Sequence, residues 1–177
     1  MPQTDRLRLR RWQDSDREPF AALNADLEVM RFFPSTRTPA ESDAMIDRLD
    51  AGIAERGYGL WAVERRDTGA FIGFVGLSQP TFDPALADQV EIGWRLARGA
   101  WGQGFATEAA REVVRFAFDP DGADLDALIS FTAAVNLPSR RVMERLGMTY
   151  DIADDFDHPA LPEGHELRPH VLYRLRR

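Results

Sequence analysis

The chain has 177 residues, a formal net charge of −7 and 44 % hydrophobic residues, which suits a globular domain with a sizeable core. It contains no cysteine, and all 22 lysine-plus-arginine positions are arginine. This composition excludes disulfides, thiolate-metal sites, a cysteine nucleophile and the lysine chemistry of Schiff bases and P-loops. The acidic balance argues against nucleic acid as a partner and suits a cationic partner such as an amine.

No apolar run approaches the length of a membrane span, and the first 12 residues lack the apolar stretch of a signal peptide. We therefore expect a cytoplasmic protein with no membrane partner. The chain shows no internal repeat, linker or low-complexity tract, so residues 1–177 are expected to form a single domain.

Hydrophobic periodicity and turn signals predict a mixed α/β domain in the order βααβββαβαββ. A capping box beginning at Ser15 is expected to open the first helix, and a second capping box at residues 38–41 the next, which Gly57 ends. The expected helices are residues 15–30, 38–57, 106–118 and 137–146. The expected strands are residues 6–11, 60–64, 70–77, 89–96, 127–135, 148–156 and 168–176.

The most informative segment is AWGQGFATEA, residues 100–109, where a strand pattern gives way to a helix pattern. Gly102 and Gly104 lie at the mouth of that helix, where serine or aspartate would be the better cap. The first amides of a helix have no intrahelical partner and carry a partial positive charge, so residues without side chains favour a phosphate ligand there. The alternative is that the glycines only permit a tight turn.

Two familiar phosphate-binding motifs do not fit this loop. A P-loop requires a lysine, which the chain lacks. A dinucleotide fingerprint requires a third small residue where the chain has Thr107, and an acidic residue after the next strand where it has Asn136. The sequence therefore indicates a phosphate ligand of another kind.

Five stretches of the chain resemble the GNAT superfamily of acyl-CoA-dependent N-acetyltransferases, and specifically the branch that includes the ribosomal-protein N-terminal acetyltransferases. They are RLRLRRW (6–12), LEVMRFFP (27–34), WAVERRDTGAFIGFVGL (61–77), VEIGWRLARGAWGQGFATEA (90–109) and NLPSRRVMERLGM (136–148). The resemblance covers nearly the whole chain. It implies a mostly antiparallel central sheet in which a splayed pair of strands forms the acyl-CoA cleft, and acetyl-CoA as co-substrate.

In this family the loop reads Arg/Gln-x-x-Gly-x-Gly/Ala, and its backbone amides bind the CoA pyrophosphate. The matching residues are Trp101, Gly102, Gln103, Gly104, Phe105 and Ala106, and Thr107, which follows them, is expected to belong to the same binding segment. Tryptophan replaces the first Arg/Gln, as it often does in this branch. The resemblance also implies that the pantetheine arm lies against Trp94, Arg95 and Leu96, and that Asn136 contacts that arm. A helix N-cap is an alternative or additional role of Asn136.

The expected reaction is acetyl transfer from acetyl-CoA to a primary amine, either a small molecule or a protein N-terminus. It needs a neutral amine, help for the oxyanion and a proton for the leaving thiolate. Because the chain has no cysteine, direct attack by the amine in a ternary complex is simpler than a covalent enzyme intermediate.

Glu91 is the first candidate for the general base, because it lies in the strand that would run beside the thioester and shares a strand face with Gly93. An exposed or salt-bridged glutamate is the alternative. The usual phenolic acid is absent, since Met143 stands where many members have tyrosine. The branch's alternative is a serine three residues after the asparagine, so the resemblance implies that Ser139 protonates or hydrogen-bonds the CoA sulfur; the alternative is that it satisfies amides of the first helical turn. Tyr173 is a weaker candidate.

The acceptor side carries no pattern that identifies the amine. Phe33 falls where the family shapes its acceptor pocket or belongs to the core, and His170 is packed in a strand or faces the substrate. The acidic stretch 154–158 would attract a cationic amine or form a solvated loop. The histidine spacings match no zinc pattern, so no metal is expected. The oligomeric state is open, with a homodimer as one candidate.

Two other classes of function compete with an enzyme. A non-catalytic acyl-CoA-binding or scaffolding protein would keep the glycine loop without a usable base, and Glu91 argues against it. A nucleotide-binding protein is disfavoured by Thr107 and Asn136. Stabilisation by acetyl-CoA but not by NAD would exclude the nucleotide-binding class, and turnover would separate enzyme from scaffold.

Overall fold

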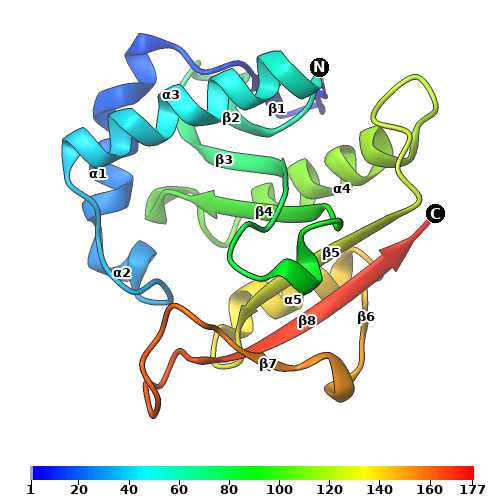
Figure 1. Cartoon of the computed structure of the whole chain (residues 1–177). Coiled ribbons are helices and arrows are strands. Elements are labelled where there is room, and N and C mark those ends of the chain that lie inside the picture. The colour runs from blue at the N-terminus through cyan, green and yellow to red at the C-terminus, as the bar shows by residue number, and fades with distance from the viewer. Residues whose placement is uncertain (1) are drawn as a thin grey trace.

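An eight-stranded sheet runs through the middle of the computed structural model, which describes residues 2–177 (Figure 1). Its strand order is β1-β2-β3-β4-β5-β8-β6, with β7 paired to β8. Of the paired strands described, β4 and β5 are parallel and the other pairs are antiparallel. The strands are β1 (Leu7–Arg10), β2 (Leu60–Arg65), β3 (Phe71–Ser78), β4 (Glu91–Leu96), β5 (Ala127–Ala133), β6 (Thr149–Tyr150), β7 (Phe156–Asp157) and β8 (Pro169–Arg176).

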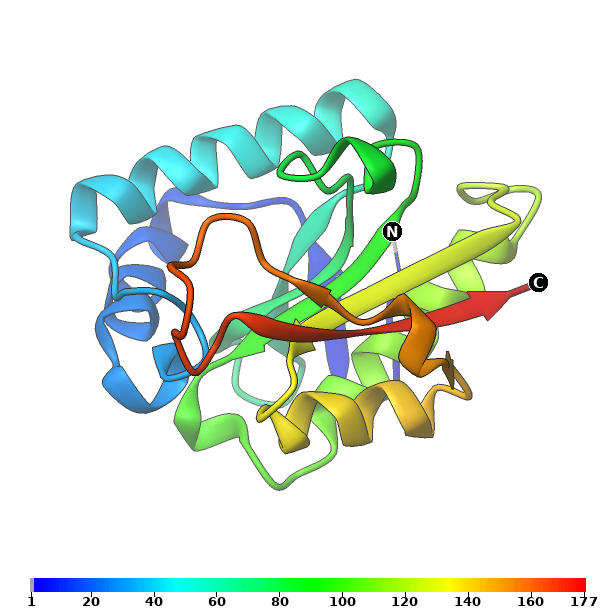
Figure 2. The same ribbon diagram turned by 60° about the horizontal axis from the view of Figure 1, so that its bottom comes forward.

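Helices cover both faces of this sheet, and Figure 2 shows α3 on one side of the strands and α5 on the other. The helices are α1 (Arg17–Ala25), α2 (Leu27–Met30), α3 (Pro39–Arg56), α4 (Phe105–Phe118) and α5 (Leu137–Arg145). Phe20 of α1 packs against Phe74 of β3, whereas Phe116 of α4 packs against Trp61 of β2. Because side chains alternate along a strand, these contacts define an α1 face and an α4 face of the sheet.

The parallel strands β4 and β5 pair at one position and then separate. Glu91 lies opposite Ile129, whose amide donates to the carbonyl of Val90 at 2.9 Å. From Gly93 to Leu96, β4 is paired with β3 alone among the described strands. One backbone edge of β4 therefore stays open next to the loop that leads into α4 (Figure 1). The predicted α/β fold with a splayed strand pair is confirmed.

The predicted capping box at Ser15 is wrong. Residues Asp14–Asp16 form a 3₁₀ turn before α1, and the Asp16 carboxylate accepts two hydrogen bonds from Arg10, at 2.7 and 2.8 Å. The same carboxylate accepts from the Gln13 amide at 2.9 Å, so the capping box lies at residues 13–16, two residues before the predicted one, and the ion pair ties this turn to β1. The second predicted capping box is confirmed, since the Thr38 hydroxyl accepts from the amide of Glu41 at 3.2 Å.

The predicted element order lacks one helix and one strand. The first helix is not continuous to residue 30, because Asp26 adopts an extended backbone and its side chain caps the separate helix α2. The expected strand 148–156 is divided into β6 and β7 by a turn in which the Asp151 side chain accepts from the Ala153 amide at 2.9 Å. In both places a short aspartate side chain competes with regular structure for backbone hydrogen bonds.

Among residues 2–177, no helix is long and apolar enough to span a membrane. The extent of one domain over residues 1–177 stays a prediction.

Candidate active site

The glycine loop makes a tight turn from β4 into α4. Gly102 and Gly104 have φ angles of +73° and +81°, a left-handed conformation that residues with side chains rarely adopt. The indole N–H of Trp101 donates to the carbonyl of Leu96 at 2.8 Å and holds the loop against the end of β4. The turn itself therefore requires the glycines, and their role in binding is a separate question.

The turn leaves a row of backbone amides without partners. None of the backbone N–H groups of residues 102–107 donates a hydrogen bond to an acceptor in the part of the chain that the structure describes, whereas the Glu108 amide donates to the Gly104 carbonyl at 3.0 Å. The approach is open, because a Cβ on Gly102 would meet no atom within 4 Å. The side chains of Phe105 and Thr107 are buried, so this segment presents backbone. Such amides can hold a phosphate.

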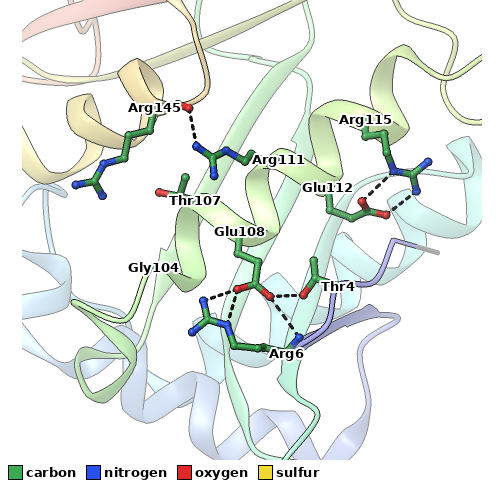
Figure 3. Close-up of a pocket in the computed structure, with 9 residues that line it drawn as sticks. All are labelled: Thr4, Arg6, Gly104, Thr107, Glu108, Arg111, Glu112, Arg115 and Arg145. Atoms are coloured by element: carbon green, nitrogen blue, oxygen red, sulfur yellow. Dashed lines mark hydrogen bonds and ion pairs between the residues drawn. The ribbon is translucent and has the colours of Figure 1, made fainter.

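An open depression of about 610 Å³ begins at this helix start and runs along α4 (Figure 3). On one side Arg6 Nε donates to the Glu108 carboxylate at 2.7 Å, and on the other Arg111 donates to the Arg145 carbonyl at 3.3 Å. Its lining residues are Thr4, Arg6, Gly104, Thr107, Glu108, Arg111, Glu112, Arg115 and Arg145. Glu91 is not among them, so the depression adjoins the glycine loop and not the face that carries the candidate base.

The backbone of β4 alternates between its two neighbours. The carbonyls of Val90, Ile92 and Leu96 accept from Ile129, from the Ser130 hydroxyl and from Trp101, all on the β5 side. By the same alternation the peptide groups of Trp94 face the opening and those of Arg95 face β3. Of the three residues predicted to lie along the pantetheine arm, Arg95 therefore has its backbone turned away from the opening.

Glu91 begins β4, and its side chain lies on the α1 face. Its carboxylate accepts one hydrogen bond, from Ser78 Oγ of β3 at 3.1 Å. Burial raises the pKa of Glu91 to about 7, although the hydrogen bond from Ser78 opposes the shift. No ion pair to Glu91 is found among residues 2–177, so the geometry does not match the salt-bridged alternative. A carboxylate with this pKa can accept a proton near neutral pH.

Gly93 and Arg95 follow Glu91 on the same face of β4. A Cβ on Gly93 would approach only the Glu91 carboxyl group, with Oε1 at 3.5 Å, so the face between the two charged residues is open. Arg95 is 8 % exposed, and its Nη1 donates to Oδ1 of Asn24 in α1 at 2.7 Å. We call this strip of β4, from Glu91 through Gly93 to Arg95, the β4 trough.

The segment after α2 crosses the splayed end of the sheet. Phe32 packs against a cluster that contains Ala133 of β5 and Leu161, whereas the Phe33 ring lies over the Arg95 guanidinium with its centre 4.0 Å from Cζ. Two adjacent aromatic residues therefore contact both sides of the opening. Phe33 is 36 % exposed at the end of the β4 trough, where it can shape the space for a ligand.

His170 lies within an aromatic cluster and not beside Glu91. Its ring centre is 4.9 Å from that of His158 and 5.4 Å from that of Phe156. Burial lowers the pKa of His170 below its usual value. In the sheet, His170 pairs with Ala133, which lies four residues along β5 from the partner of Glu91, or about 13 Å. His170 therefore lies on the α1 face but several residues along the sheet from the candidate base.

Asn136 and Ser139 lie at the start of α5. Asn136 is the N-cap, since its Oδ1 accepts from the Ser139 amide at 3.3 Å and its Nδ2 donates to Thr132 Oγ1 at 2.8 Å. The Ser139 hydroxyl is half-buried and has no hydrogen-bond partner within residues 2–177. The Tyr173 hydroxyl, in contrast, accepts from Arg140 Nε at 3.3 Å. The structure thus favours Ser139 over Tyr173 as a free hydroxyl.

Two partners of the site residues had no signal in the sequence. Ser78 donates to Glu91 across the β3–β4 strand pair. Asn24, which accepts from Arg95, lies 71 positions away from it in the sequence. The alternation of β4 did hold a signal for Arg95, because it puts that side chain on the face of Glu91 and Gly93.

Residues 6–149 match the family model described as acetyltransferase (GNAT) domain. The chain is 33 % identical over 154 residues to the FsC-acetyl coenzyme A-N(2)-transacetylase of Aspergillus fumigatus, which covers 83 % of this chain and 64 % of that protein. An acetyltransferase of Agrobacterium tumefaciens has a TM-score of 0.78 at 25 % identity, over 99 % of this chain and 93 % of its own. A ribosomal-protein α-N-acetyltransferase solved with coenzyme A has a TM-score of 0.77 at 15 % identity, over 99 % and 96 %.

Proposed function

Because the chain belongs to the GNAT acetyltransferase family, we propose that it transfers the acetyl group of acetyl-CoA to a primary amine by direct attack in a ternary complex. That the chain is an acetyl-CoA-dependent acetyltransferase follows from the family and the named relatives. The proposal concerns the class of amine, the direct route and the residues that carry it. The observation that supports it most is the half-buried Glu91, with a pKa near 7, at the point where β4 and β5 separate.

Acetyl-CoA fits two features of the chain. The partner-free amides of residues 102–107 would hold its pyrophosphate at the start of α4. The peptide groups of Trp94 face the opening and would pair with the pantetheine amides, as an added strand pairs with a free edge. Leu96 would contribute its amide, because its carbonyl already accepts from Trp101. Asn136 is engaged as an N-cap, so its contact with the arm would be an additional one.

The acid–base steps fall to Glu91 and Ser139. Glu91 would take a proton from the attacking amine, directly or through a water molecule, and such a base contributes about 10²–10⁴-fold in rate. Ser139 would hydrogen-bond or protonate the leaving sulfur, because its hydroxyl is free among the described residues. Direct attack needs no covalent enzyme intermediate, which suits a chain without cysteine.

Release of CoA from acetyl-CoA, measured against a panel of amines and N-terminal peptides, tests this proposal. The wild-type protein should turn over at least one acceptor. Glu91→Gln keeps the shape of the side chain and should lower kcat by about 100-fold or more while acetyl-CoA still raises Tm. The control is Glu55→Gln, which removes an exposed carboxylate from α3 and should leave kcat unchanged. Stabilisation by acetyl-CoA without turnover of any acceptor would instead favour a non-catalytic acyl-CoA-binding protein.

A further inference from the structure

Arg95 is a buried cation without a counter-charge. No ion pair to its guanidinium is found in residues 2–177, and the charged residue that acts on it is another cation, Arg37. Burial and Arg37 lower the pKa of Arg95 to about 9, which still leaves it protonated at neutral pH. Arg10 is buried to the same degree but pairs with Asp16 and Glu64, each at 2.7 Å. The fold therefore balances the buried charge of Arg10 with two carboxylates and provides no carboxylate for Arg95 among the described residues.

The hydrogen-bonding edge of Arg95 is only partly used. The rings of Phe33 and Phe74 lie over the guanidinium, with centres 4.0 and 5.3 Å from Cζ. Contacts to the guanidinium plane leave its N–H groups, which point outward in that plane, for hydrogen bonds. Nη1 donates to Asn24, Nε is buried without a partner, and Nη2 donates to no acceptor among the described residues. Nε and Nη2 are adjacent donors that match the two oxygens of a carboxylate.

A buried and unpaired charge is costly, so an anion that enters this position would be bound strongly. We propose that Arg95 binds a carboxylate of the acceptor, and that this enzyme acetylates amines that also carry a carboxylate. The inference rests on the proposed function, because it identifies the class of amine that the same site accepts. In this proposal the Arg95 side chain selects the acceptor, which is a different role from the backbone contact with the pantetheine arm that the sequence predicted for Arg95.

The β4 trough has the layout that such an acceptor needs. Glu91 lies at one end, where the amine would lose its proton, and Arg95 lies at the other end beneath Phe33. Gly93 between them leaves the face open. Four residues of strand separate the Cα atoms of Glu91 and Arg95 by about 13 Å, and the Glu91 carboxyl group leans toward Gly93 in that span. A spacer of several atoms between amine and carboxylate would therefore fit.

A series of ω-amino acids tests the proposal: glycine, β-alanine, 4-aminobutyrate and 6-aminohexanoate, each beside its carboxamide. In the wild-type protein the best carboxylate should exceed its amide in kcat/KM by about 10–100-fold, as expected for a charged hydrogen-bonded pair. Arg95→Met should bring that ratio close to one, and Arg95→Lys should keep part of it. Arg48→Met removes an exposed arginine from α3 and should leave the ratio unchanged. Thermal unfolding checks that each variant is folded.

The outcomes separate this inference from the proposed function. Equal turnover of acids and amides, with equal losses in Arg95→Met, would overturn the inference and leave amine acetylation standing. If no acceptor is turned over, the same ligands are compared by their effect on Tm in the presence of acetyl-CoA. Stabilisation by a carboxylate but not by its amide, lost in Arg95→Met, would then support the inference without the catalytic proposal. Equal shifts in Tm would refute it.

Discussion

Burial of the Glu91 carboxylate changes both its acid strength and its cost to the fold. Its only hydrogen-bond donor in the described chain is Ser78 Oγ, which is a weak substitute for water. The resulting pKa of about 7 lies above the usual 4.5, so the folded chain holds the proton more tightly than the unfolded chain. The feature that makes Glu91 a suitable base at neutral pH therefore also reduces stability once the carboxylate is ionised.

The pH dependence of Glu91 has a defined sign. Activity should rise with pH through about 7, because only the ionised carboxylate accepts a proton, and Glu91→Gln should lack this limb. Wild-type stability, relative to Glu91→Gln, should be fully present below pH 4.5 and decline as pH rises to about 7. Denaturant unfolding of both proteins at pH 5 and pH 8 measures the difference, and a gap that does not change with pH would contradict the assignment.

Within β4 and the start of α4, the side chains and the backbone groups face different sides of the candidate site. The side chains of Glu91 and Arg95 face the α1 layer, and the peptide groups of Trp94 face the opening toward β5. The loop after β4 adds amides that the helix itself cannot satisfy. In the proposed function, one continuous segment, residues 91–107, would thus offer a different surface to each of the two substrates.

The loop glycines can be tested against a matched glycine elsewhere. Gly102 and Gly57 both have a positive φ, +73° and +77°, and a Cβ at either position would meet no atom within 4 Å. Changing either to alanine should therefore cost a similar amount of stability, about 1–2 kcal/mol. Only Gly102→Ala should also weaken acetyl-CoA binding, by about 2–10-fold if one amide contact is lost. Calorimetric titration compares the two, and equal affinities would mean that Gly102 serves the turn alone.

For the whole molecule, the α1 layer is joined to the sheet by polar contacts at both of its ends. Arg10 of β1 holds Asp16 at the start of α1, and Arg95 of β4 holds Asn24 near its end. Phe20 and its aromatic neighbours fill the space between. This layer packs on the α1 face beside the β4 trough, so we expect the shape of the proposed acceptor site to depend on contacts made far from it.

Removal of the first of these contacts should affect stability more than chemistry. Asp16→Asn leaves the buried Arg10 with one carboxylate, Glu64, and should cost about 3 kcal/mol, near the lower end for a broken buried ion pair. The KM for acetyl-CoA should not change, because the glycine loop lies in another layer. Urea unfolding and steady-state kinetics measure the two effects. If Asp16→Asn is as stable as the wild-type protein, the Arg10–Asp16 pair contributes no net stability, because its attraction only offsets the hydration that the two groups lose on folding.

Local rules determined much of this protein from the sequence. The turn from strand to helix at Gly102 and Gly104 and the capping box at Thr38 were predicted correctly, because turns and caps depend on residues within one or two turns of chain. The alternation of β4 put Glu91 and Gly93 on one face for the same reason. The resemblance of five stretches then gave the family and the splayed sheet.

The tertiary structure decided what lies around those residues. Asp16 before α1 is held by Arg10 of β1 and by the Gln13 amide, with no cap at Ser15, and Asn24 meets Arg95 from another layer. The pKa of Glu91 depends on its burial and on Ser78, and the missing counter-charge of Arg95 depends on every element packed around it. Burial and charge pairing are sums over neighbours distant in sequence, so no local pattern can specify them. The sequence alone therefore indicated an acetyltransferase, and the packing supports the proposed class of acceptor.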